Sequence, residues 1–365
     1  MVDLKTKTNK NQKTGREKED ERDMLSELPD DVLLHIMHFM NTKTAVGTSL
    51  LSKRWNNVWK CLTTLCFSLS DFKTLASYDQ FVNHIVSQRD TSIGLHRLDF
   101  EACDIKEELL HLVPPLLHDV PHLSIHLHTR SLNMFNYSIP FLFFSHSLTS
   151  LTLSIDRSRR IFILPQPIQL PALRTLNLTN VGFVVMDSDE CVEPFSSCLV
   201  LDSLVLEWCY LTNPWKVLSI SNPNLSRCTM KRYSFRLLLS TPNLTYLAIG
   251  KSMFPCEVSS TCDLALLQEA DIDITCDSHA IVLRLLKMLS YVKILTLSEP
   301  VLKTILLGVL EDESFQHPSI QTPRILPPRF VRLQTLKGEN IQQTVVLMKY
   351  LLQNSQLTEV EVINF

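Results

Sequence analysis

Glycine is scarce in this chain, with seven residues among 365. The sequence contains no G-x-G-x-x-G, no G-x-x-x-x-G-K-[ST] and no G-x-S-x-G motif, so the common phosphate-binding loops and the nucleophile elbow are absent. Long apolar runs are absent too, since stretches such as IPFLFF at 139–144 are far shorter than the roughly 20 residues that span a bilayer. These absences argue against the common nucleotide-binding enzymes and against membrane-spanning proteins.

None of the ten cysteines forms a Cys-x-x-Cys pair, which argues against zinc ribbons and thioredoxin-like sites. The N-terminus is polar and has no apolar signal-peptide core, so we expect a reduced, soluble, intracellular protein of the nucleus or the cytoplasm. The formal net charge is −3, without the basic excess that is usual in nucleic-acid binders. We therefore expect no cofactor, no nucleic acid and no membrane among its partners.

Residues 1–23 alternate basic side chains with acidic and polar ones, and we expect a disordered charged tail there. The stretch KTKTNKNQK leaves a nuclear address open, but the acidic run EKEDERD that follows it favours a plain solvated tail.

Order is predicted to begin at LSELPDDVLLHIMHFM, residues 25–40. Pro29 suits a first helical turn, and Asp30 and Asp31 fall where the positive end of the helix dipole favours anions. The helical period places four apolar side chains on one face: Leu33, Ile36, Met37 and Met40.

A third helix is predicted over SKRWNNVWKCL, residues 52–62, after a short second helix that Gly47 weakens. Ser52 can cap this third helix. Trp55 and Trp59 share one face of it, because they are four residues apart. Three short helices form a thin core, so we expect a neighbour to cover part of their apolar faces.

These residues resemble an F-box. The ordered elements are Leu-Pro, an acidic pair, a Leu/Ile-rich helix, a Val/Ser/Leu-rich segment, then Ser-Lys-Arg-Trp and a second tryptophan. The resemblance implies a module that docks on a Skp-type adaptor and, through it, on the cullin scaffold of a ubiquitin ligase. Arg54 also matches the pattern, and a role in the module's own core stays open for Trp55. The adaptor-binding residues implied are Leu28, Pro29, Leu33, Ile36, Val46, Leu51, Ser52, Trp55 and Trp59.

Beyond residue 90 the chain is periodic. LHRLDFEACDI (95–105) and LDSLVLEWCYL (201–211) fit the leucine-rich repeat pattern L-x-x-L-x-L-x-x-C-x-L, with looser copies between and after them. The fourth position of each copy falls at residues 98, 123, 151, 176, 204, 228, 247, 270 and 295, in steps of 19 to 28 residues. Such steps match the repeat period of ~20–29 residues. We therefore predict stacked parallel strands that form a solenoid.

The C-terminal part starts with PSIQTPRILPPRF (318–330), which reads as a Pro-rich loop. A weak strand, a helix and a final strand LTEVEVI are predicted after it. This order resembles the FBD region that ends many plant F-box/leucine-rich-repeat proteins. We expect the helix to turn four side chains inward: Val345, Met348, Leu351 and Leu352.

The variable positions beside the inward leucines should line the concave face of the solenoid. They run from polar through basic to acidic along the repeats, which suggests a protein ligand with complementary charge blocks; an ordinary solvated face remains an equal alternative. The predicted target-binding residues are Arg227, Lys231, Tyr246, Glu269, Asp271 and Asp273.

Histidines gather at His118, His122, His126 and His128, but no carboxylate or cysteine spacing supports a metal site, so we expect solvated or rim histidines. We predict no catalytic residues and no metal site.

The sequence predicts an α/β chain, in which a three-helix F-box precedes a leucine-rich-repeat solenoid with a parallel strand face. The expected parts are a tail (1–23), the F-box (24–68), the solenoid (69–317), a Pro-rich loop (318–329) and FBD-like terminal repeats (330–365). The resemblance implies a non-catalytic substrate-recognition subunit of an SCF-type (Skp–cullin–F-box) ubiquitin ligase. A scaffold or inhibitor that acts without ubiquitin transfer, and a small-molecule sensor, stay open; an enzyme is the least favoured class.

Overall fold

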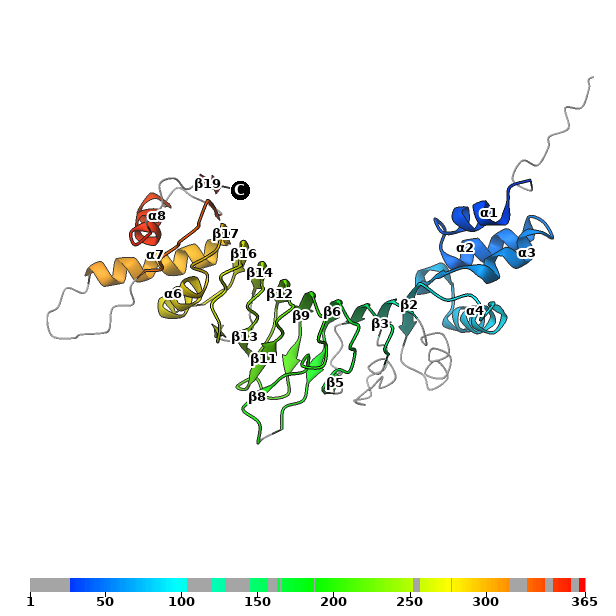
Figure 1. The fold of residues 1–365 in the computed structure, drawn as a ribbon, viewed down its shortest axis with the longest axis horizontal. Helices are drawn as coiled ribbons and strands as arrows, with labels where there is room; N and C mark the ends of the chain where they lie inside the picture. The colour runs from blue at the N-terminus through cyan, green and yellow to red at the C-terminus, as the bar shows by residue number, and fades with distance from the viewer. Residues whose placement is uncertain are drawn as a thin grey trace, which may run out of the picture.

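The computed structural model describes residues 27–103, 120–128, 145–156, 163–164, 166–186, 188–251, 257–276, 278–314, 327–338, 344–355 and 361–364. Short helices at the N-terminal end lead into a long curved sheet, and three further helices lie at its other end (Figure 1). The predicted tail (1–23), most of the Pro-rich loop and His118 lie outside the described residues.

The N-terminal helices are α1 (Asp30–Met37), α2 (Thr42–Gly47) and α3 (Trp55–Val58), with 3-10 turns at Thr48–Leu50 and Trp59–Cys61. Pro29 occupies the N-cap of α1, one position before the helix, and two aspartates follow it in the first turn. The Asn41 side chain caps α2 by accepting a 2.8 Å hydrogen bond from the Thr44 N–H.

The predicted cap of the third helix is wrong. The helix begins at Trp55 rather than at Ser52, and no side chain caps it. The Ser52 hydroxyl is buried and has no hydrogen-bond partner among the described residues.

A twelve-stranded parallel sheet forms the body of the molecule. Each repeat contributes one strand because its alternating apolar residues turn inward, as the buried/half-buried alternation along the strands shows. In spatial order the strands are β1 (Thr64–Phe67), β2 (Arg97–Cys103), β3 (His122–His128), β4 (Ser150–Ile155), β6 (Thr175–Thr179), β9 (Ser203–Glu207), β12 (Arg227–Lys231), β14 (Tyr246–Gly250), β16 (Glu269–Asp273), β17 (Ile294–Leu297), β18 (Thr335–Gly338) and β19 (Glu361–Asn364).

The strand register confirms the predicted repeat. The nine positions singled out by the pattern, from Leu98 to Leu295, pair with one another in a single unbroken row across nine strands. Leu65 extends the row on one side, and Leu336 and Val362 extend it on the other. A spacing that looks irregular in the sequence therefore becomes a straight ladder of inward side chains.

A second layer backs the sheet and differs in character along its length (Figure 1). Near the N-terminal end it contains α4 (Leu75–Gln88), and near the other end α6 (His279–Met288), α7 (Glu299–Ser314) and α8 (Thr344–Leu352). Between them lie two small parallel sheets. These consist of β5 (Ile163–Leu164), β7 (Gly182–Phe183) and β10 (Tyr210–Leu211), and of β8 (Cys191–Val192), β11 (Val217–Ser221), β13 (Arg236–Ser240) and β15 (Val258–Ser260).

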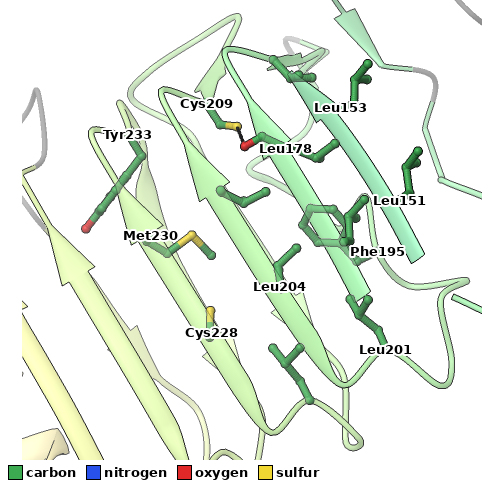
Figure 2. Packing of buried hydrophobic residues seen from close by; sticks show 14 of the residues in the cluster. Leu151, Leu153, Leu178, Phe195, Leu201, Leu204, Cys209, Cys228, Met230 and Tyr233 are labelled. Atoms are coloured by element: carbon green, nitrogen blue, oxygen red, sulfur yellow. Dashed lines mark hydrogen bonds between the residues drawn. The ribbon is translucent and has the colours of Figure 1, made fainter. Parts of the chain in front are cut away.

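One hydrophobic cluster runs through all repeats, from Leu33 in α1 to Leu351 in α8. Figure 2 shows its middle part, where Leu204 of β9 and Cys228 of β12 occupy paired positions of neighbouring strands and lie in one row of the core. The Cys209 thiol donates a 3.5 Å hydrogen bond to the Leu178 carbonyl oxygen. Because each repeat buries its leucines against its neighbours, the core continues from one repeat to the next.

The N-terminal helices join the sheet without a linker. Thr64–Phe67, which the sequence prediction places inside the F-box range, pair with β2 as the first strand. Arg89, just after α4, is 8% exposed, and its guanidinium donates to the carbonyl oxygens of Leu62 (3.3 Å) and Ile93 (2.6 Å). Burial lowers the pKa of this guanidinium. The joint thus has both backbone pairing and a buried charged anchor.

At the C-terminal end, β18, α8 and β19 occur in the predicted order. Leu351 of α8 is buried and Leu352 is half-buried, as expected, and Leu347 is a buried position that the prediction missed. The side chains of Val345 and Met348 lie outside the described residues.

Candidate protein-docking surfaces

Three of the predicted adaptor-binding residues lie inside the chain. Leu33 is 0%, Trp55 3% and Trp59 4% exposed, and all three belong to the hydrophobic cluster. The Trp59 ring lies 6.2 Å from the His84 ring of α4, measured between centroids. Both tryptophans therefore contribute to the core of the N-terminal module, and neither offers its indole surface to a partner in this structure.

The other predicted residues of this set are more accessible. Leu28, Ile36, Val46 and Ser52 are half-buried, whereas Pro29 and Leu51 are exposed. The Arg54 guanidinium forms a 2.7 Å ion pair with the Asp30 carboxylate and so ties the start of α3 to the start of α1.

The sequence prediction missed three exposed apolar residues in this module: Val32 (40%), Phe39 (81%) and Leu50 (90%). Together with Leu51 (67%) we call them the exposed F-box set. The spacing of Val32, Ile36 and Phe39, four and three residues apart, indicates a second apolar stripe beside the buried one. This spacing is the sequence feature that could have identified the exposed residues. It is hard to recognise because the same segment also carries the residues that face the core.

The predicted target-binding residues do lie on the exposed side of the twelve-stranded sheet, on three adjacent strands. Cross-strand pairing brings Arg227, Tyr246 and Glu269 into one row, and Lys231 and Asp273 lie at the C-terminal ends of their strands. The Arg227 guanidinium lies 4.3 Å from the centroid of the Tyr246 ring, which is cation–π geometry.

A hollow of about 450 Å³ opens where β9, β12, β14, β16 and β17 end. Its lining includes Lys231, Gly250, Asp271 and Asp273. Burial raises the pKa of the Asp271 carboxyl, and repulsion from Asp273 adds to this, whereas the Lys231 ammonium opposes it. The hollow was not predicted, because its shape depends on which strands become neighbours.

The histidines of the first repeats are distributed among local partners. His122 stacks edge-on against His96, with ring centroids 4.9 Å apart, and His128 lies 2.7 Å from the Asp156 carboxylate. His126 lies 3.2 Å from the Ser124 hydroxyl. Within the described part of the chain, no group of three or more His, Cys, Asp or Glu side chains is arranged to hold a metal ion.

Over the ranges that the structure describes, no helix combines the length and the apolar character needed to cross a bilayer.

Comparison with known proteins decides the family. The family model of the F-box domain matches residues 25–65, the segment that holds α1 to α3. The chain contains an F-box followed by leucine-rich repeats, and it is similar to F-box/leucine-rich-repeat proteins of plants. The matched segment carries both the buried tryptophans and the exposed F-box set.

Three relatives from Arabidopsis thaliana are named for an F-box together with leucine-rich repeats or an FBD region. The F-box/LRR-repeat protein At3g58980 is 30% identical over 248 residues, which are 63% of this chain and 40% of that protein. At4g15060, also named for an F-box and leucine-rich repeats, is 30% identical over 293 residues, 74% of this chain and 66% of its own length. The FBD-associated F-box protein At4g10400 is 30% identical over 241 residues, 61% of this chain and 54% of its own length. This F-box/leucine-rich-repeat chain thus spans less than two thirds of the length of these curated relatives.

Proposed function

We propose that this chain is the substrate-recognition subunit of an SCF-type ubiquitin ligase. In this arrangement its F-box docks on a Skp-type adaptor, which connects it to a cullin scaffold, and the exposed side of the twelve-stranded sheet binds a target protein. The chain performs no covalent chemistry of its own. It raises the local concentration of target lysines near the ubiquitin-carrying partner of the ligase, inside the nucleus or the cytoplasm.

The exposed F-box set is the observation that supports this proposal. Among the described residues, the two most exposed large apolar side chains are Leu50 and Phe39, and both lie in the F-box. Four such side chains fall within twenty residues of one small module, and a concentration of exposed apolar side chains is typical of a protein-interaction site. Covering these side chains with an adaptor would remove that surface from solvent.

Buried and exposed F-box residues have different roles in this proposal. Leu33, Trp55 and Trp59 form the core that holds the helices in place, whereas the exposed F-box set makes the contact. A direct contact between the adaptor and the buried three residues stays a prediction. The joint at β1 and Arg89 connects the F-box to the sheet, so that a target bound on the sheet keeps a defined position relative to the adaptor.

Adaptor capture by single variants of the full chain tests the first half of the proposal. Leu50→Asp places a charge on the proposed contact, and because hot-spot side chains contribute about 2 kcal/mol or more, we expect adaptor affinity to fall roughly thirtyfold. The matched control is Leu266→Asp, which alters an apolar side chain that is 51% exposed and lies in the turn before β16, outside the F-box. Equal adaptor affinity of the two variants would show that the F-box docks through another surface.

Target turnover tests the second half. Proteins that bind the full chain should gain half-life when the chain is depleted from cells, and lose that gain when wild-type chain is restored. Restoring the Leu50→Asp variant should leave them stabilised. If half-lives do not respond to depletion, the chain acts as a scaffold or inhibitor without ubiquitin transfer.

A further inference from the structure

One carboxylate on the exposed side of the twelve-stranded sheet binds the turn that follows β1. Glu101 lies on β2, and its side chain points away from the core because the residues on either side of it are buried. Its Oε2 atom accepts a 2.8 Å hydrogen bond from the Ser68 hydroxyl and a 2.7 Å hydrogen bond from the Leu69 N–H. Both donors lie at the start of the 3-10 turn Leu69–Asp71, directly after β1.

The other side of the same turn contacts the F-box. The Asp71 carboxylate accepts a 3.4 Å hydrogen bond from the Asn41 side-chain amide, and the Asp71 carbonyl oxygen accepts one from the Lys43 ammonium. Lys43 also lies 4.4 Å from the centroid of the Phe72 ring, which is cation–π geometry. Asn41 caps α2 and Lys43 lies in its first turn. The turn is therefore bonded on one side to Glu101 of the sheet and on the other to α2 of the F-box.

Aromatic packing from α4 holds this arrangement in place. Tyr78 is 0% exposed, and its hydroxyl donates a hydrogen bond to the Glu101 carbonyl oxygen. The Phe72 ring lies 5.5 Å from the Tyr78 ring and 5.1 Å from the Phe81 ring, measured between centroids. Burial raises the pKa of the Tyr78 hydroxyl, so this group stays protonated and remains a donor at neutral pH. The backbone of Glu101 is thus held by α4, while its side chain holds the turn.

The position of the carboxylate along the strands explains its effect on the joint. β1 pairs with β2 from Thr64 to Phe67, and the last pair joins Phe67 to Phe100. Glu101 is the next residue of β2, and it binds the next residues after β1. The twist between neighbouring strands ranges from about 10 to 35° in proteins, so strand pairing alone does not fix the direction of the helices before β1. The bonds from Glu101 through the turn to α2 restrict this rotation.

We propose that Glu101 is a positioning residue, which fixes the orientation of the F-box relative to the sheet through the turn Leu69–Asp71. Its role in ubiquitin transfer rests on the proposed function, because the F-box sets the angle at which a target on the sheet is presented. A carboxylate suits this role because one charged oxygen accepts both donors, and such hydrogen bonds are stronger than neutral ones. Without it, the pairing of β1 and the bonds of Arg89 keep both parts attached and folded, but their relative orientation should vary more.

Double electron–electron resonance on the full chain measures this orientation. One spin label replaces Asn57, an exposed residue of α3, and the other replaces Arg174, an exposed residue before β6. Both are introduced as non-canonical amino acids, so the native cysteines stay unlabelled. Wild-type chain should give one narrow distance peak, and Glu101→Leu should broaden or shift it. Glu101→Gln should restore the narrow peak, because its amide oxygen can still accept both hydrogen bonds.

A second variant breaks the same contact from the other side. Ser68→Ala combined with Leu69→Pro removes both donors without touching the sheet. Proline fits here because Leu69 is the first residue of the 3-10 turn and Ser68 before it is extended. This variant should broaden the peak as Glu101→Leu does, and combining the two should add nothing, because they remove one interaction. Glu269→Leu is the matched control: this half-buried carboxylate lies on the same side of the sheet, on β16, and its loss should leave the peak unchanged.

Hydrogen exchange on the same samples separates positioning from folding. A broadened peak with wild-type protection of α1 and β6 supports the inference, whereas a broadened peak with lost protection of α1 overturns it. The inference is also overturned by a narrow, unshifted peak in Glu101→Leu, by equal broadening in Glu101→Gln, or by equal broadening in Glu269→Leu.

Adaptor capture by the wild-type chain tests the proposed function separately. Capture together with an unchanged peak in Glu101→Leu leaves the proposed function standing without this positioning residue. A broadened peak in a chain that captures no adaptor leaves the positioning residue without the proposed function.

Discussion

Replacing Trp59 with alanine should unfold the F-box locally. The side chain is 4% exposed and packs against His84 of α4, so the variant leaves a cavity between the F-box and the second layer. Large-to-small changes of this kind cost about 3–5 kcal/mol. A typical domain has only about 5–15 kcal/mol of stability in total, and a core of three short helices holds a small share of it.

Hydrogen exchange on the full chain measures this effect region by region. Amides of α1 and α3 should exchange roughly two to three orders of magnitude faster in Trp59→Ala, because each 1.4 kcal/mol is a tenfold change. Amides of β6 to β16 should keep their protection, because the repeats bury their own row of leucines. The control is Trp215→Ala, a tryptophan that is 71% exposed and whose loss should change stability by less than about 0.5 kcal/mol. Wild-type protection of α1 and α3 in Trp59→Ala would refute the assignment of this tryptophan to the core.

Three further predictions concern packing, a buried charge and a buried thiol. Gly308→Ala should lower the free energy of unfolding by about 1–3 kcal/mol, read from thermal denaturation, because its Cβ would lie 2.2 Å from the His279 ring. Arg89→Met should cost about 3 kcal/mol in urea denaturation, because it removes the donors to the buried carbonyl oxygens, including that of Leu62. Burial raises the pKa of the Cys209 thiol from its ordinary value of 9.0 to about 12, so the thiol should resist iodoacetamide at pH 8 until the chain unfolds. The stability linked to this raised pKa is complete below pH 9 and should be lost as the pH rises toward 12.

Matched changes serve as controls for these three. Gly94→Ala should be neutral, because nothing lies within 4 Å of its Cβ position, and Gln88→Met removes an exposed side chain beside the buried arginine. Cys191 is exposed and should be alkylated in the folded chain. Equal effects of the paired substitutions, or equal alkylation of Cys191 and Cys209, would contradict the packing described here.

The repeat architecture was predictable because it is local in the sequence. Each strand can be recognised by its alternating apolar residues. The predicted repeat positions from Leu98 to Leu295 pair with one another in a single row across neighbouring strands. The F-box was equally visible, since its motif elements follow one another within residues 25–65. In both cases the pattern predicts the element, and the element predicts which side chains turn inward.

The second layer was less predictable. The sequence pattern left helical and extended connections open, and the structure uses α4 and α6 to α8 at the two ends but short strands such as β11 and β13 between them. Short apolar runs such as VLSIS form a strand here because parallel neighbours, β8 and β13, supply its hydrogen bonds. Such pairing depends on residues 19 or 26 positions away, which a local pattern does not contain.

The sequence by itself determined the order of parts, the period of the sheet and the side of each strand that faces inward, because these follow from spacing along one segment. Tertiary structure alone decided that both tryptophans of the F-box are buried while Phe39 and Leu50 are exposed, because the packing of the short helices on one another, and of Trp59 against His84 of α4, covers the tryptophans only. It also decided that a hollow lies where β9, β12, β14, β16 and β17 end, because only strand pairing brings these segments together. Side chains far apart in the chain share a site through pairing and packing, and no single segment encodes that proximity.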